Sequence, residues 1–473
     1  MADSDTGPDS KNSSARAEGK VGFVSLGCPK ALVDTEAIVG ELLHDGYSTV
    51  GDYAEADVVI VNTCGFIDDA VAESISTIEQ ALDKNGRVIV TGCLGAQKSM
   101  LEERFPELLH ISGPQAIAEV ADAVRSWQPL ADNTETNSRP QLPRELHGEL
   151  HGERALLTPK HYAYLKISEG CNHKCSFCII PSMRGKLASR GIKDNLVEAE
   201  RLARAGVKEL LVISQDTSAY GVDIGYREEQ FGGKRLNSDL RTLSQELGTM
   251  FDWVRLHYVY PYPNVDRLIE LMSDGKLVPY LDVPLQHGDP TILKAMRRPA
   301  AAEKTLERIK SWRTVCPELK LRSTFIVGFP GETDAQFETL LEFLREARLD
   351  RVGAFTYSNV EGASAQNLTN QVPQALKEER LGRFMALQEQ ISEEKLKGWI
   401  GQDTRVLVDE VRSTNEGLVA VARTYADAPE IDGVVHVADA AGLRAGDFAW
   451  VRIENSDAHD LYASALGDAL RLG

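Results

Sequence analysis

Three cysteines in the run GCNHKCSFCIIP are spaced to hold a metal cluster. Cys171, Cys175 and Cys178 follow a C-x3-C-x2-C pattern, which places three thiolates on one short loop. A [4Fe–4S] cluster normally takes four cysteine ligands, so three leave one iron free to bind a small molecule through its own N and O atoms. Zinc sites usually show paired C-x2-C or Cys/His sets, and no second pair follows here. The spacing therefore favours a reactive iron–sulfur cluster over a zinc site or a four-cysteine electron carrier.

Three further cysteines share one position relative to the strands expected before them. VSLGC, VIVNTC and VIVTGC end in Cys28, Cys64 and Cys93, each just after an apolar run. In an open parallel sheet the carboxyl ends of the strands lie at one edge, where ligands bind. Free cysteines are often simply buried, but three at the same topological position predict a second three-thiolate cluster. Cys316 lies in a helical stretch without such a context, and we interpret it as structural.

Segments of different character must position these cysteines. Residues 20–128 alternate apolar runs with helical stretches, which predicts an open parallel α/β sheet domain. Residues 158–394 hold six more strand–helix units, which predict a partial (β/α)6 barrel. Residues 395–473 hold five short β-branched strands, which predict a small OB-like β-barrel. Residues 129–157 have the composition of a linker, and residues 1–19 that of a disordered tail.

The individual elements follow from apolar runs and helical spacing. The Gly-rich stretch 221–240 is expected to form a loop over the site. Helices are expected over 34–46 and 68–86, which end in Gly or Asn-Gly. The expected strands are 21–26, 56–63, 86–92, 162–168, 209–215, 254–260, 281–286, 321–329, 351–358, 404–411, 417–425, 433–437, 447–454 and 461–466.

Charge and composition limit the class of partner and the cell compartment that we expect for this protein. The chain has 71 Asp and Glu against 52 Lys and Arg, a net charge of −19. This argues against a protein that coats nucleic acid, because phosphate contact relies on an excess of Lys and Arg. No apolar run is long enough to span a bilayer, and the polar start has no signal-peptide core. Seven cysteines without an export signal favour metal or redox chemistry over disulfides. We therefore expect a cytoplasmic protein without a membrane partner.

The cysteine loop, with Phe177 before its third cysteine, resembles that of radical S-adenosylmethionine (radical SAM) enzymes. Residues 20–470 as a whole resemble the methylthiotransferases. The resemblance implies an N-terminal cluster domain, a radical SAM barrel and a C-terminal TRAM domain. It also implies two [4Fe–4S] clusters and S-adenosylmethionine, which serves both as methyl donor and as source of a 5′-deoxyadenosyl radical. Hydrogen abstraction followed by sulfur attachment would insert sulfur into a C–H bond, and the protein would orient these cofactors and exclude water.

Several runs are similar to the branch of this family that modifies a ribosomal protein. The implied target is the β-carbon of an aspartate in ribosomal protein S twelve, either free or within the small ribosomal subunit. A low-potential donor of the flavodoxin or ferredoxin type would supply electrons. Ala31 departs from the Asn that this branch usually carries. The runs are LGCPKALVDTE, NTCGFIDDAVAESI, IIPSMRGKLASR and VPLQHGDPTILKAMRRP.

Two alternatives remain beside this interpretation. One keeps the chemistry but takes tRNA adenosine as substrate. That branch usually shows Gln-Ser-Gly where Gln286, His287 and Gly288 stand, and it lacks the Pro29–Lys30 pair. From residue 400 onward thirteen Asp and Glu face six Lys and Arg, which suits a basic protein partner better and leaves direct RNA binding open. The other alternative is a non-catalytic iron–sulfur electron carrier or a zinc-stabilised RNA-binding protein.

Further residues are expected to contact S-adenosylmethionine or the substrate. By resemblance, Gln215 and Asp216 at the end of the second barrel strand and Gln286 at the end of the fourth approach the cofactor, although Asp216 could equally form a turn. The Arg322 guanidinium at the start of the fifth strand could hold a cofactor carboxylate. Gly328 would allow close backbone approach to the adenine, or form a plain turn. Phe177 completes the set.

Other polar and aromatic residues are interpreted more simply. A basic cluster after the cysteine loop could position an acidic side chain, and a solvated loop is its alternative. His173 and Lys174 within the loop, and His287, are interpreted as solvated residues. Phe355 and Tyr357 are expected to pack in the core, with packing near the adenine as the alternative. The basic cluster consists of Arg184, Lys186 and Arg190.

Overall fold

The computed structural model describes residues 19–127, 154–298, 304–415 and 417–467. Residues 1–18 of the expected tail and 129–153 of the expected linker lie outside the described residues. The described end of that linker packs closely on the first helix, where a Cβ added at Gly40 would lie 2.8 Å from the Cα of Arg154. Among the described residues, no helix has the length and apolar character needed to cross a membrane.

The N-terminal domain is an open sheet in which every strand is parallel to its neighbours. The order β2-β1-β3-β4-β5 confirms the expected parallel α/β arrangement. All residues of β3 and β4 are buried, which explains their continuous apolar runs. The edge strands β2 and β5 were not expected, because they are too short to leave an apolar run. The strands are β1 (Lys20–Ser25), β2 (Ser48–Val50), β3 (Val58–Thr63), β4 (Val88–Gly92) and β5 (His110–Ile111).

Helices cover this sheet. The first, α1, begins with Pro29, whose missing N–H costs nothing in the first turn. The second, α2, ends at Asn85 and is capped by Gly86, which has the left-handed conformation (φ 77°) that favours glycine. The elements are α1 (Pro29–His44), η1 (Tyr53–Glu55), α2 (Asp68–Asn85), η2 (Leu94–Ala96), α3 (Lys98–Arg104) and α4 (Ile117–Trp127).

The central domain contains a six-stranded parallel sheet, which confirms the expected partial barrel. Its strand order is β15-β14-β13-β12-β9-β6, so the two edge strands do not meet. The strands are β6 (Tyr162–Lys166), β9 (Glu209–Ile213), β12 (Trp253–Leu256), β13 (Tyr280–Asp282), β14 (Lys320–Val327) and β15 (Arg351–Thr356).

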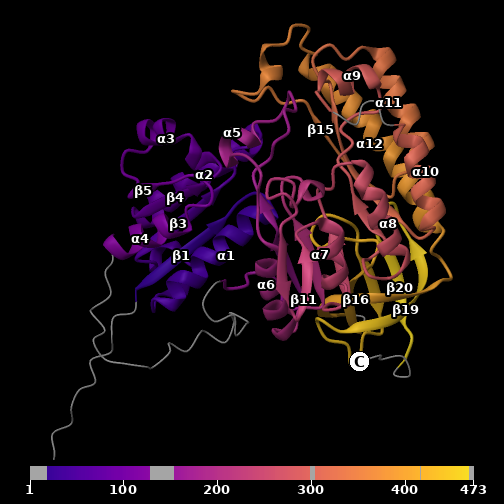
Figure 1. Ribbon diagram of the computed structural model, residues 1–473, viewed down its shortest axis with the longest axis horizontal. Helices are drawn as coiled ribbons and strands as arrows, with labels where there is room; N and C mark the ends of the chain where they lie inside the picture. The colour runs from indigo at the N-terminus through magenta and orange to yellow at the C-terminus, as the bar shows by residue number, and fades with distance from the viewer. Residues whose placement is uncertain (1–18, 128–153, 299–303, 416, 468–473) are drawn as a thin grey trace, which may run out of the picture.

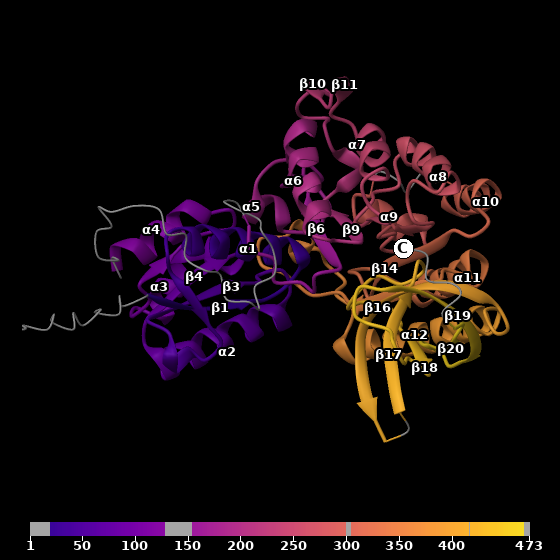
Figure 2. The same cartoon turned by 90° about the horizontal axis from the view of Figure 1, so that it is seen from below.

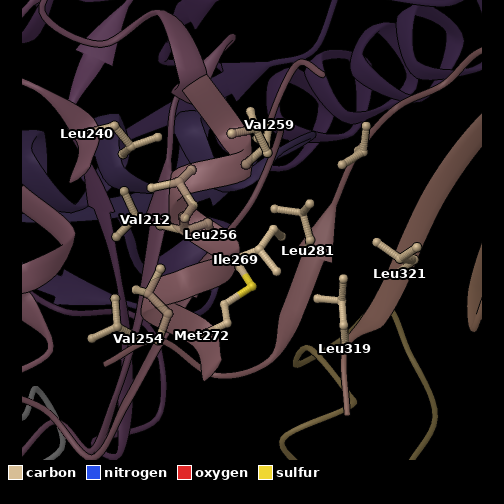
Figure 3. Close-up of a cluster of buried hydrophobic side chains, with 14 of the residues drawn as sticks. Val212, Leu240, Val254, Leu256, Val259, Ile269, Met272, Leu281, Leu319 and Leu321 are labelled. Atoms are coloured by element: carbon tan, nitrogen blue, oxygen red, sulfur yellow. The ribbon is translucent and has the colours of Figure 1, made fainter. Parts of the chain in front are cut away.

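The main core lies between this sheet and its outer helices. Figure 3 shows Val212, Leu256 and Leu281 from the strands facing Ile269 and Met272 of α8. In β14, buried and half-buried residues alternate, because one face meets the helices and the other meets the barrel interior. The helices are α6 (Ile192–Arg204), α7 (Leu240–Leu247), α8 (Asp266–Ser273), α9 (Pro290–Ala295), α10 (Thr305–Val315), α11 (Asp334–Ala347) and α12 (Gln374–Lys397).

Shorter elements decorate the central domain. The stretch expected as a loop contains an antiparallel hairpin of β10 and β11, closed at Gly232 and Gly233. Its strands are largely charged, so they give no apolar signal, and this corrects the expectation. The short elements are β7 (Ser168–Glu169), α5 (Ile180–Arg184), β8 (Ala188–Ser189), η3 (Thr217–Ala219), β10 (Glu228–Phe231), β11 (Lys234–Asn237), η4 (Pro263–Val265) and η6 (Ser364–Asn367).

The C-terminal domain is a closed five-stranded barrel, as expected, in the order β16-β17-β18-β20-β19. It lies at the end of the chain drawn in yellow, away from the indigo N-terminal domain (Figures 1 and 2). Its interior is filled by small and branched residues such as Val406, Ala420 and Val451. The strands are β16 (Asp403–Thr414), β17 (Gly417–Thr424), β18 (Val435–Ala438), β19 (Phe448–Ser456) and β20 (Leu461–Ala465).

The small barrel covers the amino ends of the central strands. The hydroxyl of Tyr162, the first residue of β6, donates to Glu430 at 2.9 Å. The hydroxyl of Tyr280, the first residue of β13, donates to Asp432 at 2.6 Å. Both carboxylates lie in the segment between β17 and β18. The opposite, carboxyl ends of the central strands therefore remain free for the cysteine loop.

Candidate active site

The loops that carry Cys28, Cys64 and Cys93 lie against one another at the carboxyl edge of the N-terminal sheet. A Cβ added at Gly27 would lie 3.2 Å from Sγ of Cys64, so the first loop touches the second thiol. A Cβ added at Gly65 would lie 3.1 Å from the carbonyl carbon of Cys93, so the second loop touches the third. The N–H of Cys93 also donates to the Thr63 carbonyl at 3.0 Å. The three strand ends thus bring these cysteines together, as the topology predicted.

The three thiols of this group differ in their surroundings. Burial raises the pKa of Cys28, but Lys30, Arg184 and nearby backbone N–H groups outweigh it, so that pKa lies below its usual range. Burial raises the pKa of Cys64. Burial also raises the pKa of Cys93, although Arg184 opposes this rise. Two cations therefore lie beside the group and favour thiolate over thiol.

Backbone and side-chain contacts anchor the loop of Cys171, Cys175 and Cys178 to the central domain. The N–H of Ser176 donates to the Met296 carbonyl at 3.0 Å, and its hydroxyl donates to the Ala295 carbonyl at 2.9 Å. The N–H of Ala365 donates back to the Ser176 carbonyl at 2.7 Å. The N–H of Cys178 donates to the Cys175 carbonyl at 3.2 Å. The middle of the loop is therefore fixed on both sides.

These thiols are also screened from solvent. Burial raises the pKa of Cys171 to about 11 and that of Cys178 to about 12. Each of these two thiols also interacts electrostatically with Cys175, so the group lies close together. Arg298 contacts this group of thiols. Its Nη1 is 3.8 Å from Sγ of Cys175, and its guanidinium lies 3.8 Å from the ring centroid of Tyr260.

Both groups offer the donor set that a three-cysteine iron–sulfur cluster needs. All seven cysteines of the chain are free thiols. Each group provides three thiols and at least one buried cation, Arg184 for the first and Arg298 for the second. Positive charge beside thiolate ligands offsets the negative charge of a cluster. In the described part of the chain, no three or more His, Cys, Asp or Glu side chains are gathered as a site for a single metal ion.

Arg184 connects the two cysteine groups. It is the last residue of α5, the helix that follows the cysteine loop, and α5 lies beside the N-terminal domain in both views (Figures 1 and 2). Its Nε donates to Sγ of Cys93 at 3.2 Å. Its Nη1 is 3.2 Å from Asp34 of α1 and 3.0 Å from Glu169 of the central domain. The side chain is only 1% exposed, so it is not the solvated loop residue of the alternative interpretation.

Lys166 and Glu169 extend this network. Lys166 forms ion pairs with Asp34 and, at 2.8 Å, with Glu169. Burial alone would raise the pKa of Glu169, but Lys166 and Arg184 lower it to about 2. Gln215 donates from Nε2 to Glu169 at 2.5 Å, and its Oε1 is buried with no hydrogen-bond partner in the described part of the chain. The network thus joins the first helix of the N-terminal domain to the ends of β6 and β9.

Asp216 and His173 form a pair beside Cys171. Their Oδ2 and Nε2 atoms lie 2.8 Å apart. Asp216 also caps η3, accepting from the N–H of Ser218 at 3.1 Å, so it fulfils the turn role as well. The His173 ring stacks on Tyr260 at 4.2 Å between centroids. This corrects the interpretation of His173 as a solvated residue, whereas Lys174 is exposed.

The remaining expected residues are placed as follows. Phe177 is half-buried and packs against the hydrophobic cluster that includes Ile292 and Phe329. Gln286 is half-buried with a positive φ of 72°, and its N–H donates to the Thr324 carbonyl at 2.9 Å. His287 is buried, 3.1 Å from Glu332, which corrects its interpretation as a solvated residue.

Gly328 and Arg322 make contacts within the chain that compete with the roles expected of them. The N–H of Gly328 donates to Glu332 at 3.0 Å, and a Cβ there would lie 2.4 Å from Cγ of Lys377. Its φ of 73° supports the plain turn. Arg322 lies near the amino end of β14 and pairs with Asp282 at 3.2 Å and with Asp432 of the small barrel at 3.4 Å. The Arg322 guanidinium therefore binds these two carboxylates, and its contact with a cofactor carboxylate stays a prediction.

The basic cluster and the sixth strand also differ from expectation. Arg190 pairs with Glu198 at 2.6 Å, and Lys186 is exposed, so the three cations do not act together. Phe355 is 56% exposed rather than part of the core, whereas Tyr357 is buried as expected.

A cavity of about 360 Å³ opens beside Cys171. His173, Asp216 and Tyr262 line it together with Cys171. Val222 and Tyr226, from the segment before the β10–β11 hairpin, form part of its wall. The cavity is therefore bounded by the cysteine loop, the end of β9 and the segment that was expected to cover the site.

Comparison with known proteins agrees with this division of the chain. Residues 165–344 match the Radical SAM superfamily, residues 20–113 the uncharacterized protein family UPF0004, and residues 400–466 the TRAM domain. The ribosomal protein uS12 methylthiotransferase RimO of Acidithiobacillus ferrooxidans is 58% identical over 94% of this chain and 97% of its own length. The RimO of Methylobacillus flagellatus is 56% identical over 94% of this chain and 98% of its own.

Among solved structures, the radical S-adenosylmethionine methyltransferase TsrM from Kitasatospora setae is similar with a TM-score of 0.49 and 14% sequence identity. The match covers 72% of this chain and 75% of that protein.

Proposed function

This chain belongs to the ribosomal protein uS12 methylthiotransferases, RimO, and we propose that it attaches a methylthio group to the β-carbon of an aspartate in ribosomal protein uS12. The observation that carries the proposal is the contact through which Arg184 links the two cysteine groups. Arg184 belongs to the helix after one group and donates to Cys93 of the other at 3.2 Å. Two reactive centres that share one buried side chain can act on the same substrate atom.

We assign one [4Fe–4S] cluster to each group, with Cys28, Cys64 and Cys93 holding the first and Cys171, Cys175 and Cys178 the second. When bound, the clusters and S-adenosylmethionine supply reductive cleavage and the transfer of sulfur and methyl. Other residues of the chain supply charge to the thiolates and hold the cysteine loop in place. Arg298 and Arg184 bring positive charge to the thiolates, and the anchored backbone of Ser176 holds the loop in place.

S-adenosylmethionine is assigned to the cavity beside Cys171. Its volume of about 360 Å³ suits a ligand of that size. His173, held by Asp216 and stacked on Tyr260, stabilises one wall. Gln215 follows β9 and Gln286 follows β13. Both therefore lie beyond the carboxyl ends of these strands, where barrel enzymes bind ligands. Phe177 supports the loop by packing against a buried hydrophobic cluster that includes Phe329.

The proposed partners are uS12, free or within the small ribosomal subunit, and a low-potential donor of the flavodoxin or ferredoxin type. We assign no RNA contact to the small barrel. The C-terminal residues from 400 onward contain thirteen acidic and six basic side chains, which supports a basic protein partner over a phosphate backbone.

Intact-mass analysis of uS12 tests the proposal. The protein is isolated from cells with and without this gene, and modified peptides are mapped by fragmentation. We expect a gain of one methylthio group in place of one hydrogen, on an aspartate, only in cells that have the gene. Unchanged uS12 together with altered tRNA thiomethylation would instead identify the tRNA substrate.

A further inference from the structure

Lys30 extends from the N-terminal domain to the mouth of the central barrel. It is the second residue of α1 and lies two positions after Cys28. Its Nζ is 3.4 Å from the ring centroid of Tyr258 and 3.4 Å from the carbonyl oxygen of Ser214. Ser214 follows the last residue of β9, and Tyr258 lies two residues after β12. The ammonium therefore lies over the carboxyl ends of two barrel strands, where barrel proteins bind their ligands.

The ammonium of Lys30 is buried and has few hydrogen-bond partners among the described residues. The residue is 8% exposed, and an ammonium has three hydrogen-bond donors. Its one hydrogen bond within the described residues is the long contact with Ser214. No carboxylate of the described residues forms an ion pair with it, whereas Lys166 nearby pairs with both Asp34 and Glu169. Buried ammonium groups are normally paired, because their desolvation is costly.

The carboxylates around Lys30 already have other partners. Glu169 binds Lys166 and Arg184, and Asp282 binds Arg322 at 3.2 Å. The face of Tyr258 holds the ammonium by a cation–π contact instead. Lys30 thus keeps donors that no described residue of the chain uses.

A second unused donor belongs to Arg184. Its Nη2 is buried and has no hydrogen-bond partner among the described residues, although its Nε and Nη1 are both engaged. Lys30 and Arg184 both act electrostatically on Cys28. Two cationic donors beside one thiol form a receptor for an anion with two oxygen atoms.

We propose that Lys30, assisted by Arg184, binds a ligand carboxylate between the two cysteine groups, and that this carboxylate is the side chain of the substrate aspartate. The inference rests on the proposed function. The carbon to be modified is bonded directly to that carboxylate, so binding the carboxylate positions the reacting carbon beside the Cys28 group. Lys30 is then a positioning residue that selects aspartate. The carboxylate of S-adenosylmethionine is the other possible source of the same chemistry.

The test compares binding of uS12 to the reconstituted holoprotein and its variants. Wild-type uS12 and the form in which the modified aspartate is changed to Asn are titrated by fluorescence anisotropy. The wild-type enzyme is expected to bind the Asp form at least about tenfold more tightly, as loss of a charged hydrogen bond implies. Lys30→Met should bind both forms equally, and Lys30→Arg should retain the preference.

Separate measurements distinguish the source of the carboxylate and the state of the protein. Equal iron content in all variants shows that the Cys28 group is intact, and Lys30→Gln replaces Lys30→Met if the latter loads less iron. Unchanged affinity for S-adenosylmethionine assigns the carboxylate to uS12. A tenfold loss of that affinity, with the Asp preference retained, assigns it to S-adenosylmethionine instead.

Two results would separate this inference from the proposed function. Lys30→Met and Lys30→Gln could both retain the Asp preference and the affinity for S-adenosylmethionine of the wild type. This result would overturn the role of Lys30 and leave the proposed function intact. If the wild-type enzyme neither binds nor modifies uS12, the proposed function fails. The variants are then compared by their affinity for S-adenosylmethionine. An affinity equal to that of the wild type would overturn carboxylate binding by Lys30 as well.

Discussion

Nε of Arg184 lies 3.2 Å from Sγ of Cys93, although the two residues are 91 positions apart and belong to different domains. The same guanidinium pairs with Asp34 and Glu169, one from each side of the domain boundary. Arg184 and Lys166 both bind these two carboxylates and so link the two domains beside the cysteine groups. Contacts within the chain therefore contribute to the relative position of the two groups.

Replacing Arg184 should destabilise the contact between the domains. In Arg184→Met, Asp34 and Glu169 lose one cation and keep Lys166, and removal of one partner from a buried pair costs about 3 kcal/mol or more. Arg104→Met is the matched control, because Arg104 pairs with Glu79 at the same 3.0 Å but is 49% exposed. We expect the control to lose less than about 1 kcal/mol. Urea unfolding followed by tryptophan fluorescence measures both, and equal losses would contradict the role of the buried pair.

Arg423 should hold the small barrel on the central sheet. Its side chain is 2% exposed and pairs with Glu209 of β9 at 2.6 Å and with Asp409 at 2.7 Å. Arg423→Met should cost about 3–5 kcal/mol, because it leaves Glu209 with Arg255 alone. Limited proteolysis between residues 397 and 403 should accelerate. Arg452→Met, which breaks an exposed pair with Asp403, should leave the cleavage rate unchanged. Equal cleavage of the two variants would show that the buried pair does not fasten the barrel.

Asp282 should make the central domain sensitive to acid. Burial alone would raise its pKa, but His257 and Arg322 lower it to about 2. A carboxyl group with a lowered folded-state pKa stabilises the protein above its unfolded pKa of about 4, and this contribution disappears as pH falls through 2. Between pH 5 and pH 2, Asp282→Asn should therefore lose about 2 kcal/mol less than the wild type does. Unfolding by urea at several pH values measures the difference. Parallel pH profiles for the two proteins would contradict this account of Asp282.

Removing the first cysteine group should separate the two halves of the proposed chemistry. With Cys28, Cys64 and Cys93 all changed to Ala, we expect no methylthiolated uS12, while cleavage of S-adenosylmethionine continues within about threefold of wild type. Mass analysis of uS12 and chromatography of the cleavage products measure the two reactions. Loss of cleavage in a folded variant would show that the groups do not divide the work in this way.

Much of this architecture could be predicted from local patterns. The runs VIVNT and VIVTG are buried parallel strands, and the cysteines that follow them meet because parallel strands end at one edge. Six strand–helix units and five short strands were likewise visible as apolar periodicity. The β10–β11 hairpin was missed because its strands are largely charged.

The contacts between domains could not be predicted in this way. Nothing in the local sequence of Arg184 indicates Cys93 as its partner, and nothing around Arg322 indicates Asp432. Both contacts depend on how separate domains pack, which periodicity does not report. Lys30 was visible only as part of the Pro29–Lys30 pair, and its unused donors become evident only once Tyr258 and Ser214 are in place.

The central claim is that the chain holds two clusters, one for each cysteine group. Iron and acid-labile sulfide are quantified in anaerobically reconstituted wild type, in the triple Ala variants of each group, and in Cys316→Ala as a control. The expected contents are about eight irons per chain for wild type and control, and about four for each triple variant. A folded triple variant that keeps the full wild-type content, or one that loses all its iron, would contradict the claim.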